Sequence, residues 1–169
     1  MKKSLVLTGM MGVGKSTVGK GLAKRLNFTF IDIDSLIEKK EKISVSKIFA
    51  SKGEKYFRKV EKLISLEQLN KKNCVISLGG GAFINDDIRK KVLKNTMSFW
   101  LNLSVKLILE RNNKLNLRPL IRNDKSGNVI AKIYNRRKKI YNLANFRIDC
   151  DKLSKNDTIE NILTIYENN

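Results

Sequence analysis

A glycine-rich nonapeptide near the start of the chain, GMMGVGKST at residues 9–17, constrains the fold more than any other stretch. It satisfies the pattern G-x-x-x-x-G-K-[ST] and lies between an apolar run, Ser4–Thr8, and a stretch of helical periodicity, Lys15–Leu26. Glycines let backbone N–H groups converge on an anion, and the following helix directs its unpaired N–H groups at the same point. The stretch therefore predicts a strand, a loop that holds the β- and γ-phosphates of a nucleotide, and a helix. Within it, Lys15 offers a mobile cation and Ser16 a hydroxyl ligand for Mg²⁺.

The rest of the chain alternates between strand-like and helix-like stretches. The 169 residues fit one domain. Strands are predicted at 4–8, 28–33, 74–78, 98–103 and 146–150, and helices at 15–26, 35–40, 44–50, 54–70, 86–93, 105–111, 128–143 and 158–166. Residues 112–128 are rich in Asn, contain the only proline and predict a long loop. Five short strands separated by helices indicate an α/β protein, a parallel sheet covered by helices on both faces.

Composition excludes several kinds of chemistry. Histidine is absent, so a Ser-His-Asp triad, a histidine base and zinc sites built on histidine are ruled out. The two cysteines match no metal-ligand spacing and are expected to be reduced and buried. The net charge of +19 favours anionic small ligands, but the lysines are scattered and few aromatic residues accompany them, so no specific nucleic-acid partner is expected.

No stretch has the uninterrupted apolar length of a membrane helix, and the signal-like start MKKSLVL is broken at once by Thr8 and the glycine loop. We expect a cytoplasmic protein without a membrane partner, and a monomer.

The second predicted strand is the only one that delivers carboxylates, in the sequence FIDID. Asp32 and Asp34 are two residues apart, so on an extended segment both would face the same side. That side lies beyond the carboxyl end of the strand, where ligands bind in open parallel sheets. One carboxylate could serve the metal and the other a substrate hydroxyl. Alternatively, the acids belong to a helix start, because Ser35 and Glu38 have the spacing of a capping box.

Three further features are candidates for the same site. The run Gly79–Gly81 follows an apolar strand, where backbone can approach a ligand closely or simply turn. Arg58 precedes Glu61 by three residues, so the carboxylate could hold the guanidinium, although a solvated pair has the same spacing. Arg118 lies beside the lone proline in the long loop, which is either an ordinary surface loop or a flap that closes a cation over phosphate.

These motifs together resemble the shikimate kinase family. The likeness extends through GMMGVGKSTVGKGLA, FIDID, GEKYFRKVE, VISLGGGA, LRPL and RRKKIY, in that order along nearly the whole chain. It implies a three-layer α/β/α P-loop fold with a five-stranded parallel sheet and a mobile lid loop at about 112–124. It also implies a single kinase domain, 1–169, with a substrate-binding segment at about 33–61.

The resemblance implies ATP- and Mg²⁺-dependent phosphorylation of the 3-hydroxyl of shikimate. The residues it assigns to ATP are Gly12, Val13, Gly14, Lys15, Ser16, Thr17, Arg111 and Arg118. Those assigned to shikimate are Asp34, Arg58, Gly79, Gly80, Gly81 and Arg137. Ser16 and Asp32 would organise the metal, and Lys15, Asp34 and Arg118 would be catalytic, with Asp34 as orienter or general base.

Some assignments stay open. Arg136 and Arg137 are adjacent, and Arg137 is preferred because it lies four residues before Tyr141. The adenine-contacting segment near 151–155 is not identified. The alternatives are a P-loop kinase for gluconate or a nucleoside monophosphate and, favoured only by charge, a nucleic-acid-binding ATPase.

Overall fold

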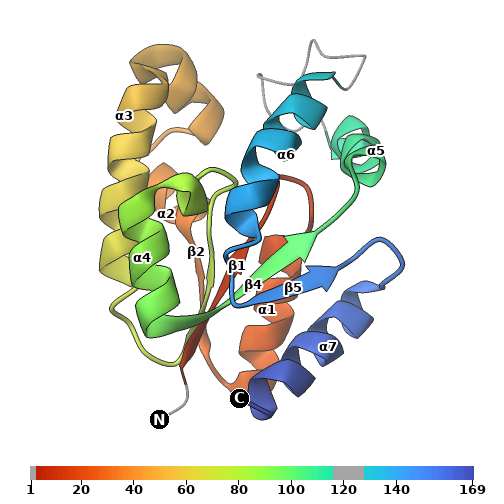
Figure 1. Cartoon of the computed structure of the whole chain (residues 1–169). Coiled ribbons are helices and arrows are strands. Elements are labelled where there is room, and N and C mark those ends of the chain that lie inside the picture. Colours follow the sequence, from red (N-terminus) through yellow and green to blue (C-terminus); the bar gives the residue numbers. More distant parts are fainter. Residues whose placement is uncertain (1–2, 116–127) are drawn as a thin grey trace.

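The computed structural model describes residues 3–115 and 128–169, with backbone only for 112–115. Five strands form one sheet in the order β2-β3-β1-β4-β5, and each neighbouring pair is parallel. Their bounds are β1 Ser4–Thr8, β2 Thr29–Asp32, β3 Cys74–Ser77, β4 Thr96–Asn102 and β5 Phe146–Asp149. Because β1 is central, the loop that follows it opens at the middle of the sheet's carboxyl edge (Figure 1).

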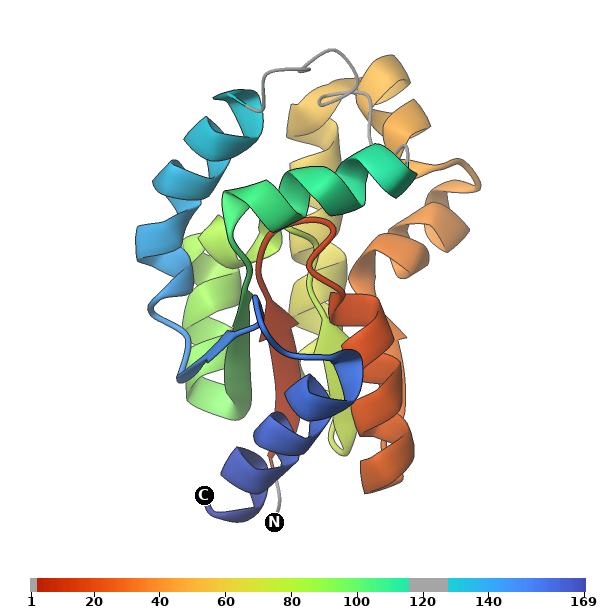
Figure 2. The same cartoon turned by 90° about the vertical axis from the view of Figure 1, so that its right-hand side faces the viewer.

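Helices cover both faces of the sheet (Figure 2). They are α1 Lys15–Leu26, α2 Ile33–Glu41, α3 Val45–Gln68, α4 Asp86–Asn95, α5 Val105–Leu115, α6 Asn128–Tyr141 and α7 Lys155–Glu167, with a short 3₁₀ turn, η1, at Ala82–Ile84. Helices α1 and α7 pack together on one face, while α3 and α4 pack together on the other. This is the three-layer arrangement that the sequence predicted.

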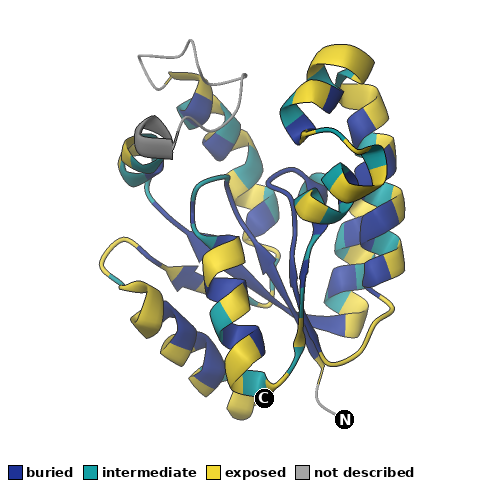
Figure 3. Ribbon diagram, turned by 180° about the vertical axis from the view of Figure 1, so that it is seen from behind, coloured by how far each residue is buried: buried dark blue, intermediate teal, exposed yellow. Residues whose placement is uncertain are grey.

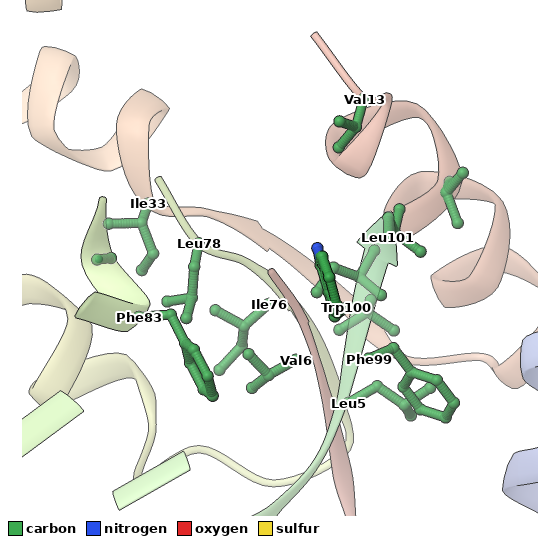
Figure 4. Close-up of a cluster of buried hydrophobic side chains, with 14 of the residues drawn as sticks. Leu5, Val6, Val13, Ile33, Ile76, Leu78, Phe83, Phe99, Trp100 and Leu101 are labelled. Atoms are coloured by element: carbon green, nitrogen blue, oxygen red, sulfur yellow. The ribbon is translucent and has the colours of Figure 1, made fainter. Parts of the chain in front are cut away.

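The hydrophobic core follows the apolar runs of the inner strands. Every residue of β1, β3 and β4 is buried, as expected for parallel strands with helices on both sides. Side chains from these strands meet those of the flanking elements, such as Ile33 and Phe83 (Figure 4). The helices bury the side that faces the sheet and expose the opposite side to solvent (Figure 3). Cys74 and Cys150 are free and buried, as predicted.

Most helix ends differ from the predictions by a few residues, and two differences are larger. The helices expected at 44–50 and 54–70 form one element, α3, which is kinked at Gly53 (φ 79°, ψ 168°). Helix α5 continues to Leu115, so the first residues of the loop predicted at 112–128 are helical. The remainder of the predicted lid, with Arg118, lies outside the described residues.

Across the described part of the chain, no helix has both the length and the apolar character needed to cross a membrane.

Candidate active site

The glycine loop joins β1 to α1 at the carboxyl edge of the sheet. Gly14 immediately precedes α1 in a left-handed conformation (φ 96°), which L side chains rarely adopt. Neither a side-chain cap at Gly14 nor an acidic residue in the first turn neutralises this end of α1. The helix therefore presents its first N–H groups and positive dipole end to an anion.

Lys15 is held against the loop that it follows. Its Nζ donates to the carbonyl oxygens of Gly9 at 2.9 Å and Met10 at 2.8 Å, and the residue is 9% exposed. Lys15 also borders the cavity beside the loop, where a phosphate would meet its ammonium group.

That cavity, of about 290 Å³, also receives the two aspartates of FIDID. Its wall includes Gly12, Gly14, Lys15, Ser16, Thr17, Asp32, Asp34 and Gly80. The Ser16 hydroxyl donates to Oδ2 of Asp32 at 2.5 Å. The structure therefore brings the loop, the two predicted metal ligands and Asp34 into one cavity.

The local geometry of the acidic pair differs from the prediction. Asp32 ends β2, but Asp34 lies in the first turn of α2, so the pair is not on one extended segment. The predicted capping box is also wrong: Asp32 is the N-cap, with Oδ1 accepting from the Ser35 N–H at 3.2 Å, and Glu38 accepts from the Val45 N–H at 2.8 Å. Asp32 therefore caps α2 and also borders the cavity. From the sequence, these two roles were alternatives.

The run Gly79–Gly81 packs against two predicted site residues, Asp34 and Arg58, and against Glu61, the partner of Arg58. A Cβ at Gly79 would lie 2.5 Å from Glu61 Oε1 and 2.7 Å from Asp34 Oδ1. A Cβ at Gly81 would lie 2.5 Å from Arg58 Nη1. The glycines therefore permit an approach between backbone and charged side chains that no other residue type would allow.

A Gly79→Ala substitution should lower kcat about 10- to 100-fold, because the new methyl group displaces Asp34 or Glu61 and small misplacements of reacting groups cost this much. Turnover and thermal melting measured on the same preparation check this. The control is Gly21→Ala, whose Cβ would lie 2.3 Å from Ile159 Cδ1 between α1 and α7. Equal loss of activity in the two variants would contradict the expectation.

Arg58 is held by two carboxylates of its own helix. Its Nη1 donates to Glu61 Oε2 at 2.7 Å and its Nη2 to Glu54 Oε1 at 3.1 Å. The Glu61 side chain is only 3% exposed. Burial opposes the charge of Arg58, yet Glu61 and Glu54 outweigh burial and raise the pKa of Arg58 above its usual value. The solvated-pair alternative does not describe this guanidinium, which is fixed at the edge of a cavity.

Arg137 borders a second cavity together with Arg58. The cavity measures about 280 Å³, and Arg58, Glu61, Gly81 and Arg137 border it. Arg137 Nη1 donates to the carbonyl oxygen of Gly80 at 2.9 Å, whereas the neighbouring Arg136 is exposed. Two guanidinium groups therefore converge beside the glycine run. Planar forks of donors suit a carboxylate ligand.

A third cavity lies on the other side of the phosphate-binding loop. It measures about 180 Å³, and α5 crosses above the loop at this point (Figure 2), where Arg111 Nη1 donates to the Val13 carbonyl at 3.3 Å. The wall also includes Cys150, Leu153, Lys155 and Thr158. Burial raises the pKa of the Cys150 thiol to about 11. Leu153 and Lys155 belong to the 151–155 segment that the resemblance associated with adenine without identifying its contacts. Nothing in the sequence marked Cys150 or Thr158, which reach this cavity through the packing of β5 and α7 beside α1.

The fold and this edge of the sheet define a P-loop phosphotransferase: a phosphate-binding loop after the central strand, with an acidic pair in the same cavity. The comparisons with known proteins narrow the class. The family model for shikimate kinase matches residues 11–167. The chain belongs to the shikimate kinase family.

Individual relatives agree with this assignment. A shikimate kinase of Sulfurihydrogenibium sp. (strain YO3AOP1) is 41% identical over 96% of both chains. Among solved structures, shikimate kinase from Acinetobacter baumannii in complex with shikimate is 28% identical, with a TM-score of 0.94 over 99% of this chain and 94% of that one. The Aquifex aeolicus enzyme is 32% identical, with a TM-score of 0.81 over 98% and 97% of the two chains.

Proposed function

We propose that this protein transfers the γ-phosphoryl group of ATP to the 3-hydroxyl of shikimate. Membership of the shikimate kinase family supports the activity and the use of ATP. The single observation that carries the proposal is that the loop, Lys15 and Asp34 border one cavity, with Arg58 and Arg137 in the cavity beside it. An acceptor whose carboxylate lies between the two arginines would have its ring beside the glycine run and a hydroxyl directed at Asp34.

The ligand set fits a hard divalent cation. Ser16 and Asp32 offer a hydroxyl and a carboxylate oxygen within 2.5 Å of each other, and Mg²⁺ is usually held by one or two protein oxygens together with phosphates and water. Among the described residues, no group of three or more histidine, cysteine or acidic side chains could hold a metal, which agrees with such a sparse site. Ser16 and Asp32 would hold Mg²⁺. When bound, the ion neutralises charge on the phosphates.

The chain's own residues then perform three tasks. The first amides of α1 and Lys15 bind the phosphates and stabilise the charge that spreads over the transferred group. Arg58 and Arg137 fix the acceptor, which makes the reaction effectively intramolecular. Asp34 orients the attacking hydroxyl and accepts its proton. We assign to Arg118, which lies outside the described residues, closure over the phosphates, and to the third cavity, beside Arg111, the adenine base.

A coupled assay on the purified protein tests the proposal. ADP release should require shikimate and Mg²⁺, and the product should carry phosphate on the 3-hydroxyl, as phosphorus and proton NMR would establish. Gluconate, nucleoside monophosphates, DNA and RNA should not replace shikimate. Turnover that depends on a nucleic acid, or that ignores shikimate, would refute the proposed function.

An Arg58→Ala substitution should weaken shikimate binding about 10- to 100-fold, since hydrogen bonds to a charged ligand are lost. The affinity for ATP should stay within about twofold, because Arg58 borders the acceptor cavity and not the phosphate cavity. Isothermal titration calorimetry measures both. Arg25→Ala is the control, since Arg25 pairs with Glu160 on the exposed surface between α1 and α7. Unchanged affinity for shikimate in the Arg58 variant would remove Arg58 from the site.

The same proposal includes a monomer in the cytoplasm. The described part of a single chain supplies the phosphate cavity and the two guanidinium groups, so no second copy is needed to form them. The free, buried cysteines suit a reducing compartment. Sedimentation at micromolar concentration should give the mass of one chain.

A further inference from the structure

One backbone carbonyl in the glycine run accepts hydrogen bonds from two side chains of α6. The carbonyl oxygen of Gly80 accepts from Arg137 Nη1 at 2.9 Å and also from the hydroxyl of Tyr141. A carbonyl oxygen has two lone pairs, so both bonds can be made at once. Arg137 and Tyr141 are four residues apart on a helix and therefore lie on the same face.

Tyr141 is itself fixed by its surroundings. The residue is completely buried, its ring centroid lies 5.9 Å from that of Trp100, and its hydroxyl is 3.8 Å from Met10 Sδ. Burial raises the pKa of Tyr141, against the opposing charge of Arg137, so its hydroxyl keeps the proton that it donates. Tyr141 is thus a rigid donor attached to the core.

The bonds form a chain from the core to the acceptor cavity. Tyr141 fixes the orientation of the Gly80 carbonyl, and that carbonyl engages one nitrogen of Arg137. A guanidinium has five N–H groups, so Nε and Nη2 stay available for a ligand while Nη1 is held. The Gly80 carbonyl therefore determines in which direction the fork of Arg137 opens.

We propose that Tyr141 is a positioning residue for acceptor binding, which acts through the Gly80 carbonyl to orient Arg137 toward the substrate carboxylate. The inference rests on the proposed function, because it takes the ligand of Arg137 to be the carboxylate of shikimate. Tyr141 borders neither the phosphate cavity nor the acceptor cavity.

The variant Tyr141→Phe tests this role, because it removes the hydroxyl and keeps the ring. KM and the calorimetric Kd for shikimate should rise about 3- to 10-fold, the usual effect of one lost internal hydrogen bond. The value of kcat and the KM for ATP should stay within about twofold of those of the unaltered enzyme, because Asp34 and the phosphate-binding loop keep their places. A merely structural tyrosine would not produce this split between acceptor and nucleotide.

Tyr134→Phe is the matched control. Tyr134 lies on the same helix and is also buried, but its hydroxyl donates to Asn102 Oδ1 at 2.8 Å in β4 and not to the glycine run. Loss of the Tyr134 hydroxyl should lower the melting temperature about as much as Tyr141→Phe does. The KM for shikimate should stay unchanged. The double variant Tyr141→Phe/Arg137→Ala should bind shikimate within about twofold of the Arg137→Ala single variant. The residue through which Tyr141 acts is already absent from that single variant.

Several results would overturn the inference. Equal losses in kcat and in both KM values, an unchanged Kd for shikimate, or full additivity with Arg137→Ala would each do so. A crystal structure of the unaltered enzyme with shikimate, in which the Tyr141 hydroxyl has left Gly80, would do so without any variant. An unaltered enzyme that neither binds nor phosphorylates shikimate would instead refute the proposed function, so the two failures are distinguishable.

Discussion

Replacement of Lys15 by alanine is expected to lower kcat about 10³-fold, the effect of removing one well-placed donor from developing negative charge. Lys15 borders the phosphate cavity, and its ammonium group donates to the Gly9 and Met10 carbonyls. Those two carbonyls belong to a loop whose shape is set mainly by its glycines, so the substitution should not unfold the protein. Single-turnover phosphoryl transfer at saturating ATP and shikimate measures the effect on the chemical step.

The control for this variant is Lys24→Ala. Lys24 lies in the last turn of the same helix and is exposed, so its loss should leave turnover within about twofold. If the Lys15 variant retained near-normal kcat, or if it lost activity only because its melting temperature collapsed, the assignment of Lys15 to the transferred phosphate would be wrong.

The second large effect is expected at Asp34. The Asp34→Asn substitution keeps the size of the side chain and removes the charge and the ability to accept a proton, which should lower kcat about 10²- to 10⁴-fold. Binding of shikimate should weaken by less than about tenfold, because the amide can still bond a hydroxyl. Comparison of kcat with the calorimetric Kd separates the two contributions. Asp34→Ala should lose at least as much kcat.

Asp87→Asn serves as the comparison, because Asp87 pairs with Lys62 on the surface, at 2.5 Å, and borders neither the phosphate cavity nor the second cavity. Near-normal turnover by the Asp34→Asn enzyme would exclude Asp34 as the base. A loss confined to KM would reduce its role to that of an orienting group.

Much of the fold was readable from the sequence, because its main signals are local. The glycine loop, the fully apolar β1, β3 and β4, and the alternation of strand and helix each depend on residues close together in the chain. The kink at Gly53 was foreseen as a gap between two helices, but their continuity in α3 was not. That continuity depends on the tertiary packing of α3 against α2 and α4.

The sequence predicted those parts of the candidate site that depend on the type and spacing of nearby residues. It did not predict the contacts that tertiary packing creates. The spacing of Lys15, Asp32 and Asp34 predicted that they share one place, and they border one cavity, although the extended geometry assumed for the aspartates was wrong. Nothing local marks Tyr141 as the partner of Gly80, which lies 61 positions away in the chain. The same is true of Cys150 at the third cavity. Contacts of this kind follow from the order of the strands in the sheet, which no local pattern encodes.

The two carboxylate oxygens of Asp32 accept different hydrogen bonds. One accepts from a backbone N–H at the start of α2, and the other accepts from the Ser16 hydroxyl. The helix that begins at this carboxylate carries Asp34 in its first turn. A single side chain therefore links the first turn of α1 to the first turn of α2. Under the proposed function, the hydroxyl placed at the metal and the carboxylate placed at the acceptor are thus separated by one shared side chain, so a change at Asp32 should affect both sites together.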